Sequence, residues 1–305
     1  RDAYNSLLIR SFTSGGSTLS SWTAPNPGDD GYSMGERIEV GPQGNLHVLG
    51  EFTGTVSLCN GCTSITSAGS SDVFVAKIDP ESSGSGWLWT SIGGSNHSNG
   101  DNANSMTIDS NGSVYISGTF MGTAHFGNQN VITADAYHAR SVYAADLDAD
   151  GDMDVLSASY YDDKVAWYEN MGGGEFGGQN IITTAADGAL SVYATDLDGD
   201  GDMDVLSASY YDDKIAWYEN LGDGEFGGQN VITTDTYYVK SVYASDIDGD
   251  GDMDVLSASY YDDKIAWYEN DGNGNFGGQI VITTDANEAW SVYASDLDGD
   301  GDMDV

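Results

Sequence analysis

Short apolar stretches separated by polar turns recur along the second half of the chain, with a period of about 50 residues. In one unit, apolar and polar residues alternate in 191–194, and further stretches follow at 204–209, 214–220 and 229–234. Short runs rich in Val, Ile, Tyr and Thr, bounded by Gly and Asp, are typical of strands. The pattern therefore predicts four strands per unit. This is the organisation of a propeller blade, whose sheet buries both faces only when neighbouring blades stack on it.

The first half of the chain contains a looser repeat. Residues 38–55 match residues 107–123 at a shift of about 68 positions, and each segment consists of a strand, a turn centred on Gly44 or Gly112, and a second strand. This order predicts a β-hairpin in each segment. A strand-like run at 72–79, followed by tryptophans, has a rougher counterpart in residues 2–9. Two units of roughly 65 to 70 residues result.

The two kinds of repeat can be aligned with each other if every unit is taken to begin with its first strand, which we call the entry strand. Residues 65–66 leading to the run at 72–76 parallel residues 132–133 leading to 141–145, so entry strands are expected near 2, 72, 141, 191, 241 and 291. We expect an all-β fold, a β-propeller with five complete four-stranded units and the start of a sixth. The chain is then expected to be a fragment of a larger propeller, for example one with seven blades. Neither 1–130 nor 131–305 has enough blades to close alone, so one continuous propeller is favoured over two domains.

Composition agrees with a β protein and limits its partners. The chain has 41 Gly and 19 Tyr but only 4 Pro, and it contains no apolar run of about 18 residues that could insert into a membrane. Its formal net charge is −40, and residues 131–305 alone hold 38 acidic and five basic residues. Such a charge disfavours nucleic acid or an anionic membrane as a partner.

Twenty of the acidic residues lie in four copies of one nine-residue loop with the spacing D-x-D-x-D-G-x-x-D. The copies begin at Asp146, Asp196, Asp246 and Asp296. Carboxylates at positions 1, 3, 5 and 9 and the carbonyl at position 7 can surround a hard cation, and Gly at position 6 permits a sharp turn. An EF-hand needs Glu at position 12, where Ser stands here, and the flanking residues indicate strands. The loop thus predicts a Ca²⁺ site, about four in all, and the alternative is a solvated acidic turn.

The loop, together with Glu225-Phe-Gly-Gly228, resembles the FG-GAP repeats of the integrin alpha-subunit propeller and their bacterial VCBS-type relatives. The resemblance covers residues 131–305, with Gly-Gln in place of the Gly-Ala-Pro part of the motif. It implies that five residues of each loop hold the metal, the fourth of them through its carbonyl. These are Asp146, Asp148, Asp150, Asp152, Asp154; Asp196, Asp198, Asp200, Asp202, Asp204; Asp246, Asp248, Asp250, Asp252, Asp254; and Asp296, Asp298, Asp300, Asp302, Asp304.

Residues 1–130 are similar to a different family, the bacterial seven-bladed β-propeller repeats known as SBBP repeats. The similarity rests on Asp72-Val-Phe-Val-Ala-Lys77 and on the hairpin motifs at 44–52 and 112–120. It implies a fold and no chemistry.

Cys59 and Cys62 are separated by only two residues. They could form a redox C-x-x-C, half of a zinc site, or a disulfide across a tight turn. The surrounding pattern lacks the βαβ context of a redox motif and a second Cys or His cluster for zinc, which favours the disulfide, with two free thiols as the alternative.

Aromatic residues recur in every acidic unit. Trp167, Trp217 and Trp267 stand in the middle of a strand and are expected to pack between blades, whereas the paired tyrosines at a strand end could stack on sugar rings. The acidic units differ mainly in 135–140, 185–190, 235–240 and 285–290. If each blade is antiparallel, these segments and the tyrosine turns lie on one face and the acidic loops on the other. The candidate ligand face comprises Tyr160, Tyr161, Tyr210, Tyr211, Tyr237, Tyr238, Tyr260, Tyr261 and Trp290.

Variable loops on a repeated scaffold suggest a recognition surface, with Tyr237, Tyr238 and Trp290 as anchors, although unselected variation in exposed turns would look similar. No catalytic constellation is visible, so we expect no enzyme. The prediction is a calcium-binding propeller of a secreted or cell-surface bacterial protein, with an extracellular protein or polysaccharide as its binding or adhesion partner. The alternative is a carbohydrate-binding propeller attached to a catalytic domain.

Overall fold

The computed structural model describes residues 8–12, 18–23, 31–59, 62–82, 86–120 and 130–305. They belong to two compact units, Arg1–Val131 and Ile132–Val305. Within these ranges the strands form four four-stranded and two two-stranded sheets, all antiparallel. No helix in the described ranges is long and apolar enough to cross a membrane.

The first unit contains eight of the described strands. They are β1 (Leu8–Phe12), β2 (Thr18–Thr23), β3 (Tyr32–Val40), β4 (Leu46–Val56), β5 (Ile65–Ile78), β6 (Trp87–Gly93), β7 (Asn102–Ile108) and β8 (Val114–Thr119). The sheets are β1-β2, β3-β4-β5-β6 and β7-β8. Both predicted hairpins are confirmed, as β3-β4 and β7-β8. In the second one, the carboxylate of Asp109 accepts hydrogen bonds from the main-chain N–H groups of Asn111 and Ser113 across the turn.

The predicted phase of the repeats is wrong in the first unit. Residues 72–76 were expected to be an entry strand equivalent to 141–145, but they lie in β5, the third strand of its sheet, whereas 141–145 lie in β9, a first strand. The expected boundary between residues 66 and 72 is also absent, because β5 runs without a break from Ile65 to Ile78. Alternation predicts a strand but not its place in a sheet, which here is decided by the long pairing of β5 with β4. Residues 2–7 lie outside the described residues.

The core of the first unit lies on both faces of β4. Val48 and Phe52 pack with Phe74 in one cluster, while Leu49, on the opposite face of the same strand, packs with Met106 of β7 in another. Successive side chains of a strand point to opposite faces, so neighbouring residues of β4 serve different clusters.

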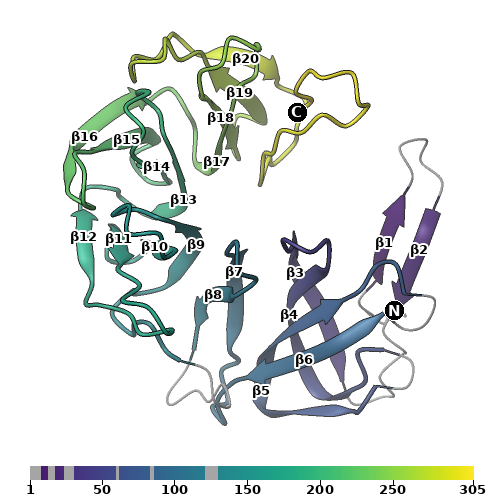
Figure 1. Ribbon diagram of the computed structural model, residues 1–305. Helices are drawn as coiled ribbons and strands as arrows, with labels where there is room; N and C mark the ends of the chain where they lie inside the picture. The colour runs from purple at the N-terminus through teal and green to yellow at the C-terminus, as the bar shows by residue number, and fades with distance from the viewer. Residues whose placement is uncertain (1–7, 13–17, 24–30, 60–61, 83–85, 121–129) are drawn as a thin grey trace. The chain divides into compact units, whose positions relative to one another are not determined.

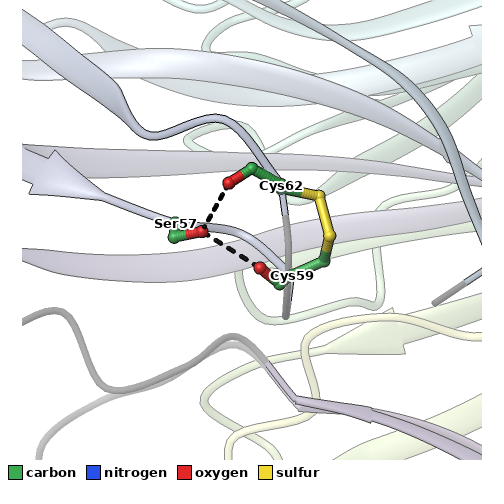
Figure 2. The surroundings of a disulfide bond; sticks show 3 residues. All are labelled: Ser57, Cys59 and Cys62. Atoms are coloured by element: carbon green, nitrogen blue, oxygen red, sulfur yellow. Dashed lines mark hydrogen bonds between the residues drawn. A yellow bond between two sulfur atoms is a disulfide. The ribbon is translucent and has the colours of Figure 1, made fainter.

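Cys59 and Cys62 form a disulfide, with their Cα atoms 5.2 Å apart (Figure 2). The hydroxyl of Ser57 donates hydrogen bonds to the main-chain carbonyls of both cysteines, over 3.0 and 3.3 Å. The pair therefore closes the turn that follows β4, as the sequence favours, and neither thiol is free.

The second unit contains three complete blades, seen as successive four-stranded sheets in Figure 1. They are β9 (Ala139–Ala145), β10 (Asp154–Ser159), β11 (Lys164–Tyr168), β12 (Asn180–Thr183); β13 (Ala189–Thr195), β14 (Asp204–Ser209), β15 (Lys214–Asn220), β16 (Phe226–Thr233); and β17 (Val239–Ser245), β18 (Asp254–Ser259), β19 (Lys264–Tyr268), β20 (Ile280–Thr283). In each blade the strands pair in chain order. Beyond β20, Ser295 pairs with Asp304 at the start of a further unit.

Stacking of neighbouring blades explains why β14 is buried along its whole length. Val205 packs in a cluster with Leu156 of the preceding blade, whereas Leu206 packs with Val242 of the following blade. The alternation of side chains sends adjacent apolar residues of one strand into two different cores. An isolated blade would expose both faces, so each blade depends on its neighbours.

The mid-strand tryptophans pack between blades, as the sequence predicts. Trp167 joins the cluster between the first two blades and Trp217 the cluster between the second and third, and each is only 6% exposed. The first strands are also linked by a ladder of rings, since Tyr193 lies 4.6 Å from Tyr143 and 5.0 Å from Tyr243, measured between ring centroids.

The chain is thus all-β and has the architecture of a β-propeller. Four complete blades lie within the described residues, and the pairs β1-β2 and β7-β8 adjoin stretches outside them. The expected count of five complete units and the start of a sixth, and the union of both halves in one propeller, stay predictions.

Candidate metal centre and ligand face

The acidic loops connect the first and second strands of each blade in the second unit. In the first loop, main-chain N–H groups turn inward to the aspartates: the N–H of Asp150 donates to Asp148 over 3.2 Å, and that of Gly151 donates to Asp146 over 3.1 Å. The glycine has a φ of 95°, a conformation that a residue with a Cβ adopts only under strain. The equivalent glycines of the other loops have φ values between 99° and 101°. Local chemistry therefore gives all four loops the same sharp turn.

This turn gathers three carboxylates in each loop, and one oxygen from each lies within 4.8 Å of the others. The groups are Asp146, Asp148, Asp154; Asp196, Asp198, Asp204; Asp246, Asp248, Asp250; and Asp296, Asp298, Asp300. The other carboxylates predicted as ligands, Asp150, Asp200, Asp254 and Asp304, belong to the same loops but not to these groups. The ligand role of the whole predicted set, including the carbonyls of Asp152, Asp202, Asp252 and Asp302, stays a prediction.

The donor set fits a hard divalent cation such as Ca²⁺, because it consists only of oxygen atoms. The geometry of the first loop supports this fit. The Oδ1 atom of Asp146 is buried and accepts no hydrogen bond from the described residues, although its Oδ2 atom accepts one from Gly151. A buried carboxylate oxygen without a partner is costly. An ion bound by the triad would supply the missing interaction.

The last aspartate of each of the first three loops, Asp154, Asp204 and Asp254, is buried at the start of the second strand. Both oxygens of Asp154 accept main-chain hydrogen bonds, from Leu147 over 2.9 Å and from Asn170 over 2.8 Å. Burial nevertheless raises the pKa of Asp154 to about 6, and it raises the pKa of Asp204 to about 7. The hydrogen bonds oppose this rise, and the nearby aspartates of the loop add to it. A cation at this position would favour the ionised form of both side chains.

An asparagine from the next blade holds each of the first two loops, a contact that the sequence analysis missed. Asn220 donates its side-chain amide to the carbonyl of Leu147, and Asn270 does the same to Leu197. The Gly-rich turn of the next blade also approaches closely: a methyl group on Gly274 would lie 2.4 Å from the ring of Trp217 and 3.4 Å from Asp198 Cβ. The only sequence signal is that Asn recurs at the same place in every unit, which many other residues also do.

An open groove of about 710 Å³ lies beside the first loop. It is lined by the carboxylates of Asp148, Asp150, Glu169, Asp223 and Glu225 together with Trp167 and other residues. The negative lining attracts cations and repels anions. The loop can therefore be reached by a metal ion from solvent.

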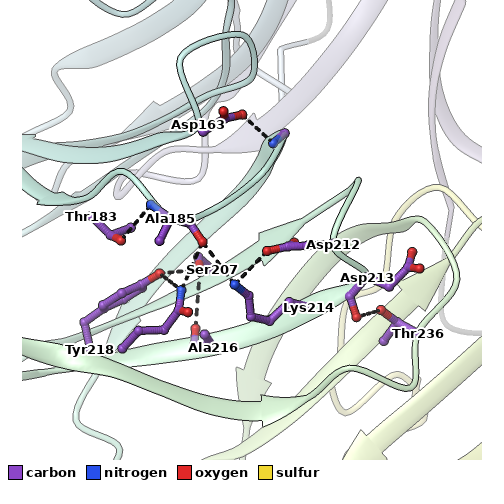
Figure 3. Close-up of polar contacts among 12 residues, drawn as sticks. Asp163, Thr183, Ala185, Ser207, Asp212, Asp213, Lys214, Ala216, Tyr218 and Thr236 are labelled. Atoms are coloured by element: carbon purple, nitrogen blue, oxygen red, sulfur yellow. Dashed lines mark hydrogen bonds and ion pairs between the residues drawn. The ribbon is translucent and has the colours of Figure 1, made fainter.

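The segments that vary between units meet the tyrosine turns at the other end of the blades. Figure 3 shows Lys214, which donates to the carbonyl of Ala185 over 3.0 Å and pairs with Asp212 over 2.6 Å. On the same face, Asp213 accepts hydrogen bonds from Thr236 and from the N–H of Tyr238. Each turn between the second and third strands thus anchors the connection that leads to the next blade.

The nine aromatic residues of the predicted ligand face form a continuous row, which we call the tyrosine face. It runs through Trp290, Tyr260, Tyr261, Tyr237, Tyr238, Tyr210, Tyr211, Tyr160 and Tyr161, and successive ring centroids lie between 4.4 and 6.0 Å apart. Several rings are largely exposed, with Trp290 at 65% and Tyr161 at 59%. The row crosses all three complete blades of the second unit, so the structure brings together residues that are up to 130 positions apart.

Comparison with known proteins gives one family match and several similar structures. The FG-GAP-like repeat matches residues 146–207, 196–257 and 246–305. No curated protein matches the chain significantly. The resemblance of residues 1–130 to SBBP repeats stays a prediction.

Three of the similar structures are a lectin, a lyase and a gluconolactonase. A lectin from Agrocybe aegerita that recognises non-reducing terminal N-acetylglucosamine is 17% identical, with 85% of this chain and 81% of the lectin covered and a TM-score of 0.44. Virginiamycin B lyase from Staphylococcus aureus is 12% identical, with 86% and 91% covered and a TM-score of 0.48. The periplasmic gluconolactonase of Pseudomonas aeruginosa is 13% identical, with 93% and 97% covered and a TM-score of 0.36.

The matched repeats together span residues 146–305, more than half of the chain, and each match begins at the first aspartate of an acidic loop. The chain therefore belongs to the FG-GAP-like repeat family.

Proposed function

We propose that this chain is a calcium-binding β-propeller module of a secreted or cell-surface bacterial protein, and that it binds an extracellular protein or glycan through the tyrosine face. The observation that carries the proposal is the chemical difference between the two ends of the blades. Carboxylates gather at one end, and exposed aromatic rings form a row at the other. Millimolar calcium outside cells suits oxygen-only loops of this kind.

In this proposal the metal has a structural role. A Ca²⁺ ion bound in each loop supplies positive charge that offsets the repulsion among the aspartates. The buried Asp154 and Asp204, which ionise with difficulty, gain most from it. Because the first two loops also contact the following blade through Asn220 and Asn270, a filled loop at either place stabilises the stacking of blades. The ligand face then rests on a rigid frame.

The metal part of the proposal is tested by thermal unfolding of the whole chain with and without EDTA and by titration of the whole chain with Ca²⁺. Excess EDTA should lower Tm, since a ligand at about 100 times its Kd stabilises by about 2.7 kcal/mol per site. Asp198→Asn should remove one site and leave the others. Glu225→Gln, which removes one exposed charge near a loop, is the matched control and should bind calcium normally. An unchanged Tm in EDTA would refute the metal hypothesis.

The binding part is tested by capture of partners from extracellular material and by a glycan array. Tyr238→Ala and Trp290→Ala should each weaken binding, because large rings at the centre of a contact commonly supply much of its energy. Glu225→Ala, at the opposite end of a blade, should not. Loss of binding by Glu225→Ala alone would place the partner on the loop end instead.

A second candidate is a carbohydrate-binding propeller attached to a catalytic domain. The exposed tyrosine rings favour it, because aromatic rings can pack against the C–H groups of sugars. We propose no catalytic role for the chain itself. Turnover of a polysaccharide by the isolated chain would contradict this, and glycan binding without a protein partner would favour the second candidate.

A further inference from the structure

The basic residues of the second unit are few, and they occupy two kinds of environment. The chain from 131 to 305 holds Arg140, Lys164, Lys214, Lys240 and Lys264. Lys164, Lys214 and Lys264 each pair with an aspartate two positions earlier. Lys240 makes no ion pair with the described residues and lies instead among the rings of the tyrosine face. In so acidic a unit, a lysine that packs among aromatic rings and makes no ion pair with the described residues calls for an explanation.

Three rings surround the ammonium group of Lys240. Its Nζ atom lies 4.3 Å from the ring centroid of Tyr210, 4.4 Å from that of Trp290 and 5.1 Å from that of Tyr260. These distances allow cation–π attraction to all three rings. Burial lowers the pKa of Lys240, and the charge of Arg140 lowers it further.

Arg140 occupies the same place two blades earlier. It is the second residue of β9, as Lys240 is of β17, and Leu190 stands at this position in the blade between them. The guanidinium of Arg140 lies 5.6 Å from the ring centroid of Tyr160. Tyr160 in turn contacts Tyr210, so a pair of rings connects the two cations.

Part of the main chain on this face is already hydrogen-bonded within the protein. The N–H groups of Tyr160 and Tyr161 already donate to the carbonyls of His138 and Tyr137, and the N–H of Tyr210 donates to Gly188. A peptide that adds a strand needs free main-chain groups. The groups that the tyrosine face presents include rings, hydroxyls and the two cations, which together match a sugar that carries a negative charge.

We propose that Arg140, Lys240 and the adjoining rings bind a carboxylate-bearing sugar, such as a single uronic acid residue. This inference rests on the proposed ligand role of the tyrosine face. A carboxylate on this face is attracted by the charge of either cation, and a guanidinium can donate two parallel hydrogen bonds to a carboxylate. The sugar ring packs on the exposed tyrosines through its C–H groups. Glu288, whose carboxylate interacts with Tyr260, is the nearby negative charge that weakens this binding.

The test compares a galacturonate tetrasaccharide with its methyl ester, which keeps the sugar and removes the charge, by isothermal titration of the calcium-loaded chain. The acid should bind at least about tenfold more tightly than the ester, as expected for one charged hydrogen bond. Lys240→Met should abolish this difference and Lys240→Arg should retain it. Leu190→Met, at the equivalent position of the intervening blade, should have no effect, and Glu288→Gln should tighten binding of the acid.

Each result that contradicts the expectation leads to a different conclusion. Equal binding of acid and ester would overturn the carboxylate site and leave glycan binding by the tyrosine face standing. Binding of a polyglutamate peptide but of neither saccharide would assign the cations to an acidic peptide. Binding of none of these probes would overturn the inference, whereas the proposed binding role of the tyrosine face fails if Tyr238→Ala and Trp290→Ala leave every captured partner bound. The Tm of each variant shows whether it is folded.

Discussion

The side-chain amide of Asn220 donates a hydrogen bond of 2.8 Å to the main-chain carbonyl of Leu147, a residue 73 positions earlier in the chain. Leu147 lies between the first two aspartates of an acidic loop, and the N–H of Asn220 donates to Asp204, the last aspartate of the loop in its own blade. One buried asparagine therefore touches the loops of two successive blades, and Asn270 repeats the arrangement one blade later.

Asn220→Ala should destabilise the second unit more than Asn170→Ala. Both substitutions leave a carbonyl of their own blade without its amide partner, that of Met203 or Met153, but Asn220→Ala also removes the bond to Leu147. A buried group left unpaired costs about 1–3 kcal/mol, which is the expected difference between the variants in urea unfolding. Calcium titration of Asn220→Ala should also show one weakened site. Equal losses for both variants would show that the contact between blades contributes nothing.

Ala149→Gly should stabilise the chain. Ala149 has a φ of 60° at the fourth position of the first loop, where the other loops carry glycine. A left-handed conformation costs a residue with a Cβ about 1 kcal/mol relative to glycine, so a gain of roughly that size should appear as a higher Tm. Gly249→Ala makes the reverse change where no atom would meet the new methyl group, and it should lower Tm by a similar amount. A lower Tm for Ala149→Gly would contradict the strain argument.

His47 should make the first unit sensitive to mild acid. It is 1% exposed, its ring lies 6.0 Å from that of Trp89, and its pKa is lowered from the usual 6.5 chiefly by burial and further by the charge of Lys77. The unfolded chain therefore takes up this proton first as the pH falls, so the histidine's contribution is present above about pH 6.5 and lost below it. Tm should fall more between pH 7 and pH 5 in the wild type than in His47→Leu. Carboxylates titrate in a similar pH range in both proteins. Parallel curves of Tm against pH would therefore show that His47 is not the cause of the loss.

The Cys59–Cys62 disulfide should protect both thiols and add modest stability. A thiol-reactive dye should label the unreduced folded chain little, and label it at two positions after reduction and unfolding. Replacing both cysteines by serine should lower the free energy of unfolding by about 2 kcal/mol, because the bond closes only a very short loop. Stoichiometric labelling of both cysteines without reductant would contradict the pairing.

Features that depend on local pattern could be read from the sequence. The strands of the acidic units follow from alternation and turn residues, and the loop turn follows from a glycine at the sixth position, where φ exceeds 90° in every copy. The placing of acidic loops and tyrosine turns at opposite ends follows from antiparallel pairing within a blade. Even the packing of Trp167 between blades could be predicted, because a large ring in mid-strand has only that place to be buried.

Contacts between residues far apart in the chain were decided only by the tertiary structure. The apolar run at 72–79 indicates a strand, but only the ten-pair register of β5 with β4 extends that strand back to Ile65 and makes it the third strand of its sheet. The contact of Asn220 with Leu147, and the place of Lys240 among three rings, each join residues from different blades. The physical reason is that a periodic sequence specifies which way a side chain points, whereas its neighbour across a blade interface depends on how the sheets stack.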